Sequence, residues 1–129
     1  MFIMLLVIVS FAETMTFYTE GRYYITIDSD GELNTTGATL EDRSKWEFDT
    51  DSECFIHSSN TGTVRQSTYW FETDDIEYED EGITLVATSD AGNTRRFYFL
   101  VESVLIILNS YSDGSKDIVS FEVKNIVTK

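Results

Sequence analysis

The chain has 129 residues, of which 42% are apolar and 14% aromatic, enough for one domain with a packed core. Nine basic residues against 23 acidic ones give a net charge of -14, which repels nucleic-acid phosphates and anionic lipid headgroups. The composition therefore predicts a single globular domain that binds neither nucleic acid nor an anionic membrane surface.

An uninterrupted apolar run opens the chain over residues 1–12. It is shorter than the roughly 20 residues that a membrane-spanning helix needs. Ser10 and Ala12 put small side chains where a signal peptidase requires them for a cut before Glu13. We therefore expect a signal peptide and a secreted, periplasmic or cell-envelope protein. The alternative is that residues 1–12 form an extra apolar strand, and residues 13–129 are one β-barrel domain in either case.

The remainder of the chain alternates apolar and polar residues over short runs that end in turn signals, as antiparallel strands do. After a turn at Glu20 and Gly21, the residues Tyr23, Ile25 and Ile27 occupy every second position and are expected to be buried. Residues 32–44 are polar and indicate either a weak strand or a surface loop. The predicted strands are residues 15–19, 22–28, 45–50, 53–59, 63–72, 76–78, 83–88, 97–101, 104–108 and 118–123.

Two of these strands carry the tryptophans. In residues 45–50 the alternation points Trp46 and Phe48 inward. In residues 63–72 both faces carry large side chains, with Trp70 on one face and Phe71 on the other, so the buried face cannot be assigned from the pattern.

The fold class follows from the same pattern. Proline is absent, the seven glycines fall mostly at turns, and no segment has the period of a helix. We predict an all-β fold, an antiparallel up-and-down meander of about 8 to 10 strands that forms a small barrel or a strongly curved sheet. A β-trefoil is the main alternative.

Residues 45–124 also resemble the lipocalin-like, or calycin, small β-barrels. The resemblance rests on Tyr-Trp-Phe at 69–71, Gly-Ile-Thr-Leu at 82–85, Arg-Phe-Tyr-Phe at 96–99 and Phe-Glu-Val-Lys-Asn at 121–125. It implies a barrel whose interior either holds a small apolar ligand or is filled with side chains.

No motif in the chain indicates catalysis, a metal site or a cofactor. The only histidine, His57, lies three residues after the only cysteine, Cys54, so in a strand the two point to opposite faces. One histidine gives neither a zinc-ligand spacing nor a Ser-His-Asp signature. Seven acidic residues in the stretch 72–81 are best explained as a solvated edge that discourages aggregation. We therefore predict a non-enzymatic protein without cofactor or metal.

The stretch 97–108 is apolar on both faces. Val104 and Ile106 alternate with Leu105 and Ile107, although a barrel strand needs only one apolar face. We expect Leu105 and Ile107 to lie on the outside and to be covered by another segment or another subunit.

Three functions are compatible with these observations. The first is a ligand-binding barrel for a small apolar or aromatic molecule. The second is a structural or interaction protein, such as an envelope or filament subunit, that self-associates through residues 104–108. The third is a carbohydrate-binding module that uses exposed Tyr and Trp. For the first, the predicted cavity-wall residues are Tyr23, Ile25, Trp46, Phe48, Trp70, Phe97, Phe99 and Phe121.

Overall fold

The computed structural model describes residues 14–128, and the side chains of all of these except residues 36–39 and 128. Most of the chain, 71%, is strand. In order, the strands are β1 (Met15–Ile27), β2 (Leu33–Asp49), β3 (Cys54–Asn60), β4 (Val64–Trp70), β5 (Glu77–Glu79), β6 (Gly82–Ser89), β7 (Thr94–Leu100), β8 (Ser103–Ser110) and β9 (Lys116–Thr128). A short 3₁₀ turn, η1 (Thr73–Asp75), precedes β5. The predicted signal peptide lies outside the described residues.

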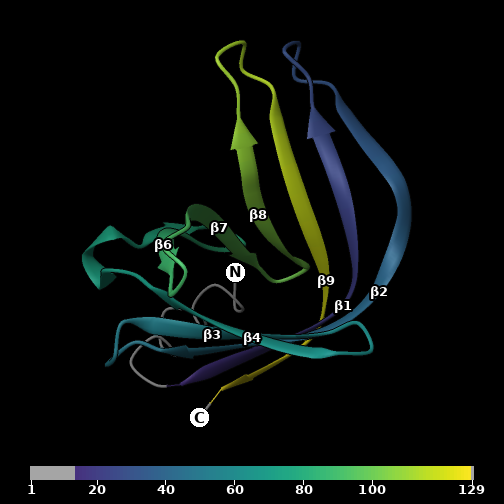
Figure 1. Ribbon diagram of the computed structural model, residues 1–129. Coiled ribbons are helices and arrows are strands. Elements are labelled where there is room, and N and C mark those ends of the chain that lie inside the picture. The colour runs from purple at the N-terminus through teal and green to yellow at the C-terminus, as the bar shows by residue number, and fades with distance from the viewer. Residues whose placement is uncertain (1–13, 129) are drawn as a thin grey trace.

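The strands form a single antiparallel meander that closes on itself (Figure 1). β1 pairs with β9 from Met15↔Thr128 to Ile27↔Lys116, so the first and last strands close the circle. β4 pairs with β6 through Tyr69↔Ser89 and Trp70↔Thr88, and the short β5 pairs with the same edge of β6 at its other end, from Glu77↔Thr84 to Glu79↔Gly82. The result is a closed eight-stranded barrel, which confirms the predicted fold class and excludes the β-trefoil alternative. At this level the architecture also agrees with the calycin resemblance.

Alternate residues of the strands face the barrel interior and build an aromatic core. Trp46 is 0% exposed, and its ring lies 5.7 Å from Phe99 and 5.1 Å from Phe121, centroid to centroid. Phe48 and Phe99 are closer still, at 4.5 Å and nearly perpendicular. Trp46 and Phe48 point inward as predicted. Edge-to-face pairs at these distances add to the stabilisation that burial alone provides.

A β-bulge replaces the turn that was predicted at Glu20 and Gly21. β1 runs straight through this point, and its pairing with β2 and β9 shifts between Glu20 and Arg22. Gly21 has a φ of 77°, a backbone conformation that glycine adopts without strain. The extra residue reverses the alternation, so Arg22 and Tyr24 pair with the core residues Phe121 and Val119. Tyr23, Ile25 and Ile27 are half-buried and lie outside the core cluster, contrary to the prediction that they form the buried face.

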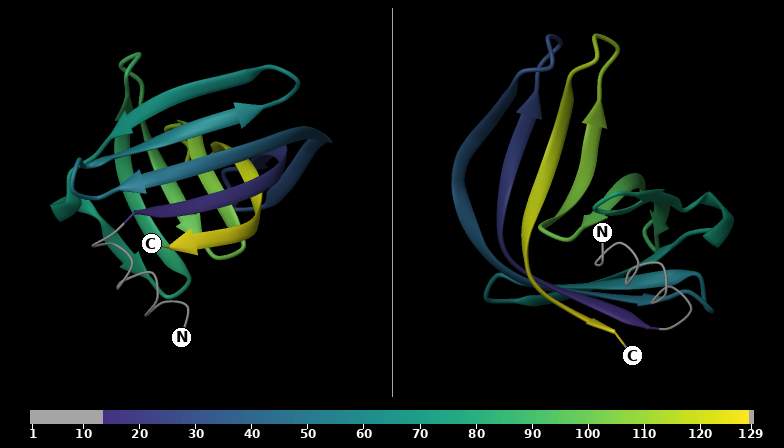
Figure 2. Two further views of the ribbon diagram at one scale, coloured as in Figure 1. Left: turned by 90° about the horizontal axis from the view of Figure 1, so that it is seen from below. Right: turned by 180° about the vertical axis from the view of Figure 1, so that it is seen from behind.

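Residues 33–44 form strand rather than a loop, because β2 begins at Leu33 and pairs with β1. However, β3 pairs with β2 only between Lys45 and Asp49. On the other side of the barrel, β7 pairs with β8 only from Val104 to Ile106. The hairpins β1–β2 and β8–β9 consequently rise beyond the ring as a curved sheet (Figures 1 and 2). We call the side from which they rise the open end of the barrel.

One glycine is required by packing rather than by its φ angle. A Cβ atom on Gly82 would lie 2.0 Å from the backbone oxygen of Phe99 on the neighbouring strand. Gly82 therefore lets β6 and β7 approach closely at the point where β6 begins.

Within residues 14–128 no helix is long and apolar enough to cross a membrane.

Candidate functional site

Five of the eight predicted wall residues lie inside the barrel. Phe97 and Phe121 are no more than 2% exposed, like the three core rings described above. Phe55, which was not among the predicted wall residues, joins them at 5.0 Å from Phe97 and 5.1 Å from Phe48. These rings pack against one another, so side chains fill this part of the interior. That they contact a ligand stays a prediction.

The other three predicted wall residues do not face the interior. Trp70 is 53% exposed, because its neighbour Tyr69 takes the inward position and stacks on Phe55 at 4.9 Å. The face of β4 that carries Tyr69 is therefore the inner one, which the sequence pattern could not assign. Tyr23 and Ile25 lie on the outside of β1, since the Gly21 bulge turned the alternation over.

Leu105 and Ile107 occupy the outer face, where they were expected. Val104 and Ile106 are buried in the core, whereas Leu105 and Ile107 are half-buried on the opposite face of β8. Cross-strand pairing extends this face into two rows. The first row is Tyr98, Leu105, Ser120 and Tyr23, and the second is Ile107, Ile118 and Ile25.

A chain of polar side chains enters the core beside Trp46. The hydroxyl of Ser44 donates a hydrogen bond of 2.8 Å to Asp42 Oδ1, and Nε2 of His57 lies 2.9 Å from the same Ser44 Oγ. Because Ser44 has a single hydroxyl proton, which goes to Asp42, His57 is the donor to Ser44. Beside this chain the indole N–H of Trp46 donates to Thr19 Oγ1 at 3.1 Å.

Burial sets the electrostatics of this chain. The ring of His57 stacks on Trp46 with centroids 3.6 Å apart, and it meets the edge of Phe121 at 5.7 Å. Removal from water lowers the pKa of His57 to about 3, with a smaller contribution from the positive charge of Arg22. His57 is therefore neutral at pH 7, which agrees with its role as a donor through one ring nitrogen.

The order of contacts differs from that of a catalytic triad. In a triad the histidine sits between the hydroxyl and the carboxylate and accepts the hydroxyl proton. Here Ser44 sits in the middle and gives its proton to Asp42, so His57 does not activate the hydroxyl. The arrangement satisfies buried polar groups and holds β2 against β3.

Asp42 and Arg22 end the chain as an ion pair. Arg22 Nε lies 3.6 Å from Asp42 Oδ2, longer than the 2.7–3.2 Å of an N–H···O hydrogen bond. Both atoms are buried, and neither has a hydrogen-bond partner within the described part of the chain. The Asp42 side chain is 0% exposed, whereas that of Arg22 is 30% exposed.

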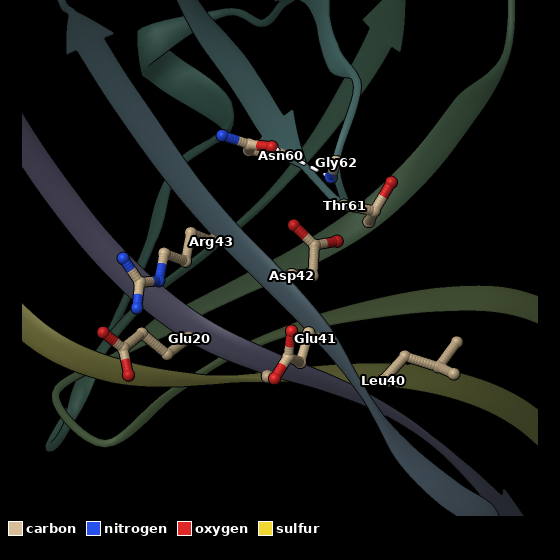
Figure 3. Close-up of a pocket in the computed structure, with 9 residues that line it drawn as sticks. Glu20, Leu40, Glu41, Asp42, Arg43, Asn60, Thr61 and Gly62 are labelled. Atoms are coloured by element: carbon tan, nitrogen blue, oxygen red, sulfur yellow. Dashed lines mark hydrogen bonds between the residues drawn. The ribbon is translucent and has the colours of Figure 1, made fainter.

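A pocket of about 430 Å³ lies at this point of the open end (Figure 3). It exists because the β2–β3 ladder ends at Lys45↔Ser58, beyond which the tip of the β3–β4 hairpin moves away from β2. Figure 3 shows the Asp42 carboxylate projecting from β2 toward this tip. The tip turn is held by a 3.0 Å bond from the Gly62 N–H to Asn60 Oδ1. The lining residues are Glu20, Gly21, Leu40, Glu41, Asp42, Arg43, Asn60, Thr61 and Gly62.

The acidic stretch 72–81 lies elsewhere, around η1 and β5. Asp74, Asp75, Glu77 and Glu79 are all exposed. In the described ranges, no group of three or more His, Cys, Asp or Glu side chains is placed to hold a metal ion.

Sequence reasoning missed Asp42 and Ser44, although a signal for them is present. Both lie at the even-numbered positions of β2 that also carry Trp46 and Phe48 inward. Extending the alternation of residues 45–50 backward would have placed two polar side chains inside the barrel.

Neither protein families nor curated protein sequences give a match to this chain.

Proposed function

We propose that this protein is a non-enzymatic β-barrel that binds a small molecule in the pocket at its open end. The observation that carries the proposal is the pocket itself, about 430 Å³ in volume, which lies between β1, β2 and the tip of the β3–β4 hairpin. Its lining offers carboxylate, amide and hydroxyl groups beside the apolar side chain of Leu40, the kind of mixed lining that small-molecule sites have.

The geometry favours this pocket over the centre of the barrel. The five predicted wall residues inside the barrel are in mutual ring contact, whereas the pocket has a volume in the range that small-molecule sites occupy. We further propose that the protein is exported, which the apolar run of residues 1–12 supports.

A blocking variant tests the proposal. Thr61 lines the pocket at the exposed tip of the hairpin, and Thr63 lies on the same tip outside the lining. Ligand-detected NMR with the full chain and a fragment library should find binders whose affinity falls about tenfold or more in Thr61→Trp, since the indole fills the pocket. The same binders should retain their affinity in the control Thr63→Trp. Finding no binder, or binders that Thr61→Trp leaves unaffected, would reject the pocket as the binding site.

A second function is favoured by the outer face. Its two rows place the half-buried Leu105, Ile107 and Ile25 around the buried Ile118 on adjacent strands. They adjoin the end of β8, which continues beyond its last pair with β7 at Ile106. An apolar face next to an unpaired strand edge suits association between copies of the chain.

Size-exclusion chromatography with light scattering tests this second function. If the face mediates assembly, the wild-type chain elutes above the monomer mass, and Leu105→Asp or Ile107→Asp returns it to the monomer because a buried carboxylate opposes association. Val86→Asp is the control, since Val86 is an apolar residue on β6, 39% exposed, outside this face. A monomeric wild type would exclude assembly through this face.

A further inference from the structure

The barrel has a weakly paired seam between β4 and β6. β4 pairs with β6 only at the last two residues of β4, Tyr69 and Trp70, whereas β1 pairs with β9 along its whole length. β5 occupies the same edge of β6 further along, and no described strand pairs with residues 85–87 between them on this edge. Closure of this side of the barrel therefore depends on the segment that joins β4 to β6.

That segment contains the acidic stretch 72–81, which we call the acidic strap. Its one buried side chain is Ile76, which is 8% exposed and belongs to the core cluster. Thr73 donates two hydrogen bonds, of 2.8 and 3.3 Å, to the carboxylate of Glu53 in the β2–β3 turn. All the other residues of the acidic strap are exposed. Apart from the short ladder of β5, its attachment thus depends on one apolar side chain and a few hydrogen bonds.

The charge of the acidic strap opposes this attachment. Seven of its ten residues are acidic, and all seven are exposed. Successive residues of an extended chain are about 3.3 Å apart, so these carboxylates lie within the Debye length of about 10 Å at 0.1 M salt and repel one another. Among the described residues only Glu77 has a cationic partner, Arg96 at 3.8 Å, and this ion pair between exposed side chains contributes little. Detachment lets the carboxylates move apart.

From these observations we infer that the acidic strap opens as a local unit while the rest of the barrel stays folded, and that ionic strength controls the opening. Salt screens the repulsion among seven carboxylates and so favours the closed strap. It also screens the single pair of Glu77 and Arg96, but this opposing effect is smaller. Opening removes Ile76 from the core and β5 from β6, which uncovers the edge of β6 over residues 82–87. This device is independent of the pocket at the open end.

Hydrogen exchange of the full chain, followed by mass spectrometry at about 10 and 300 mM NaCl, tests the inference. At low salt, peptides that cover residues 72–84 should exchange much faster than peptides from β1 and β9. At high salt their exchange should slow about threefold or more, while that of β1 and β9 changes little. Equal exchange of residues 72–84 at the two salt concentrations would overturn the inference, as would exchange as slow as that of β1 and β9.

A double variant tests whether the charge of the acidic strap causes the effect. Glu79→Gln with Asp80→Asn removes two of its charges and leaves the buried anchor in place. At low salt it should slow the exchange of residues 72–84 about twofold or more, and it should reduce the dependence on salt. Exchange identical to that of the wild type would show that these charges do not drive the opening, and the inference would fail.

The matched control removes the same amount of charge elsewhere. Asp30→Asn with Glu32→Gln changes two exposed acids at the β1–β2 turn. It should leave the exchange of residues 72–84 unchanged. If it slows this exchange as much as the strap variant does, overall charge is responsible and the inference is rejected.

Ile76→Ala tests whether the acidic strap opens separately from the barrel. Loss of the buried side chain should raise the exchange of residues 72–84 at both salt concentrations, while β1 and β9 stay protected. A uniform rise across all strands would show that the acidic strap opens only together with the whole barrel, contrary to the inference.

Discussion

Replacing Trp46 by alanine is expected to lower the free energy of unfolding by about 3–5 kcal/mol, the usual cost of deleting a large buried aromatic side chain. Trp46 is fully buried and contacts rings from β3, β7 and β9, so its removal leaves a cavity that no single strand can close. It also leaves Thr19 without the indole N–H that donates to it. Chemical denaturation followed by far-UV circular dichroism gives the measurement.

The second tryptophan is the control for this experiment. Trp70 is 53% exposed on the outside of β4, so Trp70→Ala should cost about 1 kcal/mol or less. Both tryptophans were among the predicted wall residues, and their different burial in the fold separates them. Losses of similar size for the two variants would show that the assignment of the inner face of β4 is wrong.

The second large effect concerns pH. The pKa of His57 is about 3 in the folded chain, against about 6.5 when unfolded, so between these values the unfolded chain binds the proton and the folded chain does not. Folding stability is thus unaffected by His57 above pH 6.5 and falls as the pH drops through 6.5 toward 3. Between pH 7 and pH 5 we expect this residue to cost about 2 kcal/mol.

His57→Gln isolates this effect, because the chain has no other histidine and glutamine keeps a donor for Ser44. The 23 acidic residues also change stability with pH, but they are common to both proteins and cancel in the comparison. The groups that face His57 are Arg22, Ser44, Trp46 and Phe121. Denaturation at pH 7 and pH 5 should show a larger loss for the wild type, and parallel losses would contradict the buried neutral His57.

The alternation of polar and apolar residues predicted most of the fold. It identified the strands from β3 to β9 and the inward side of Trp46, because a strand with one wet face leaves a period of two. It failed at Gly21. A bulge inserts one residue without breaking the strand, and the reversed alternation then looks like a turn followed by a new strand.

Local sequence patterns could not predict the candidate site, because the site depends on contacts between strands. The contact between Ser44 and His57 joins β2 to β3 across thirteen residues and depends on the register Trp46↔His57. The pocket depends on where the β2–β3 ladder stops, which is a property of the closed barrel and not of either strand. The outer face of β8 was predictable, since Leu105 and Ile107 break the expected alternation within one strand.

Two-dimensional NMR of the labelled full chain, titrated with the best-binding fragment, tests most directly whether the ligand site is at the open end or among the packed rings of the barrel centre. We predict that the amide signals of residues 40–43 and 60–62 shift with the added ligand, because these residues line the pocket. Shifts concentrated instead at Phe48, Phe97 and Phe99 would contradict the account and place the ligand inside the barrel.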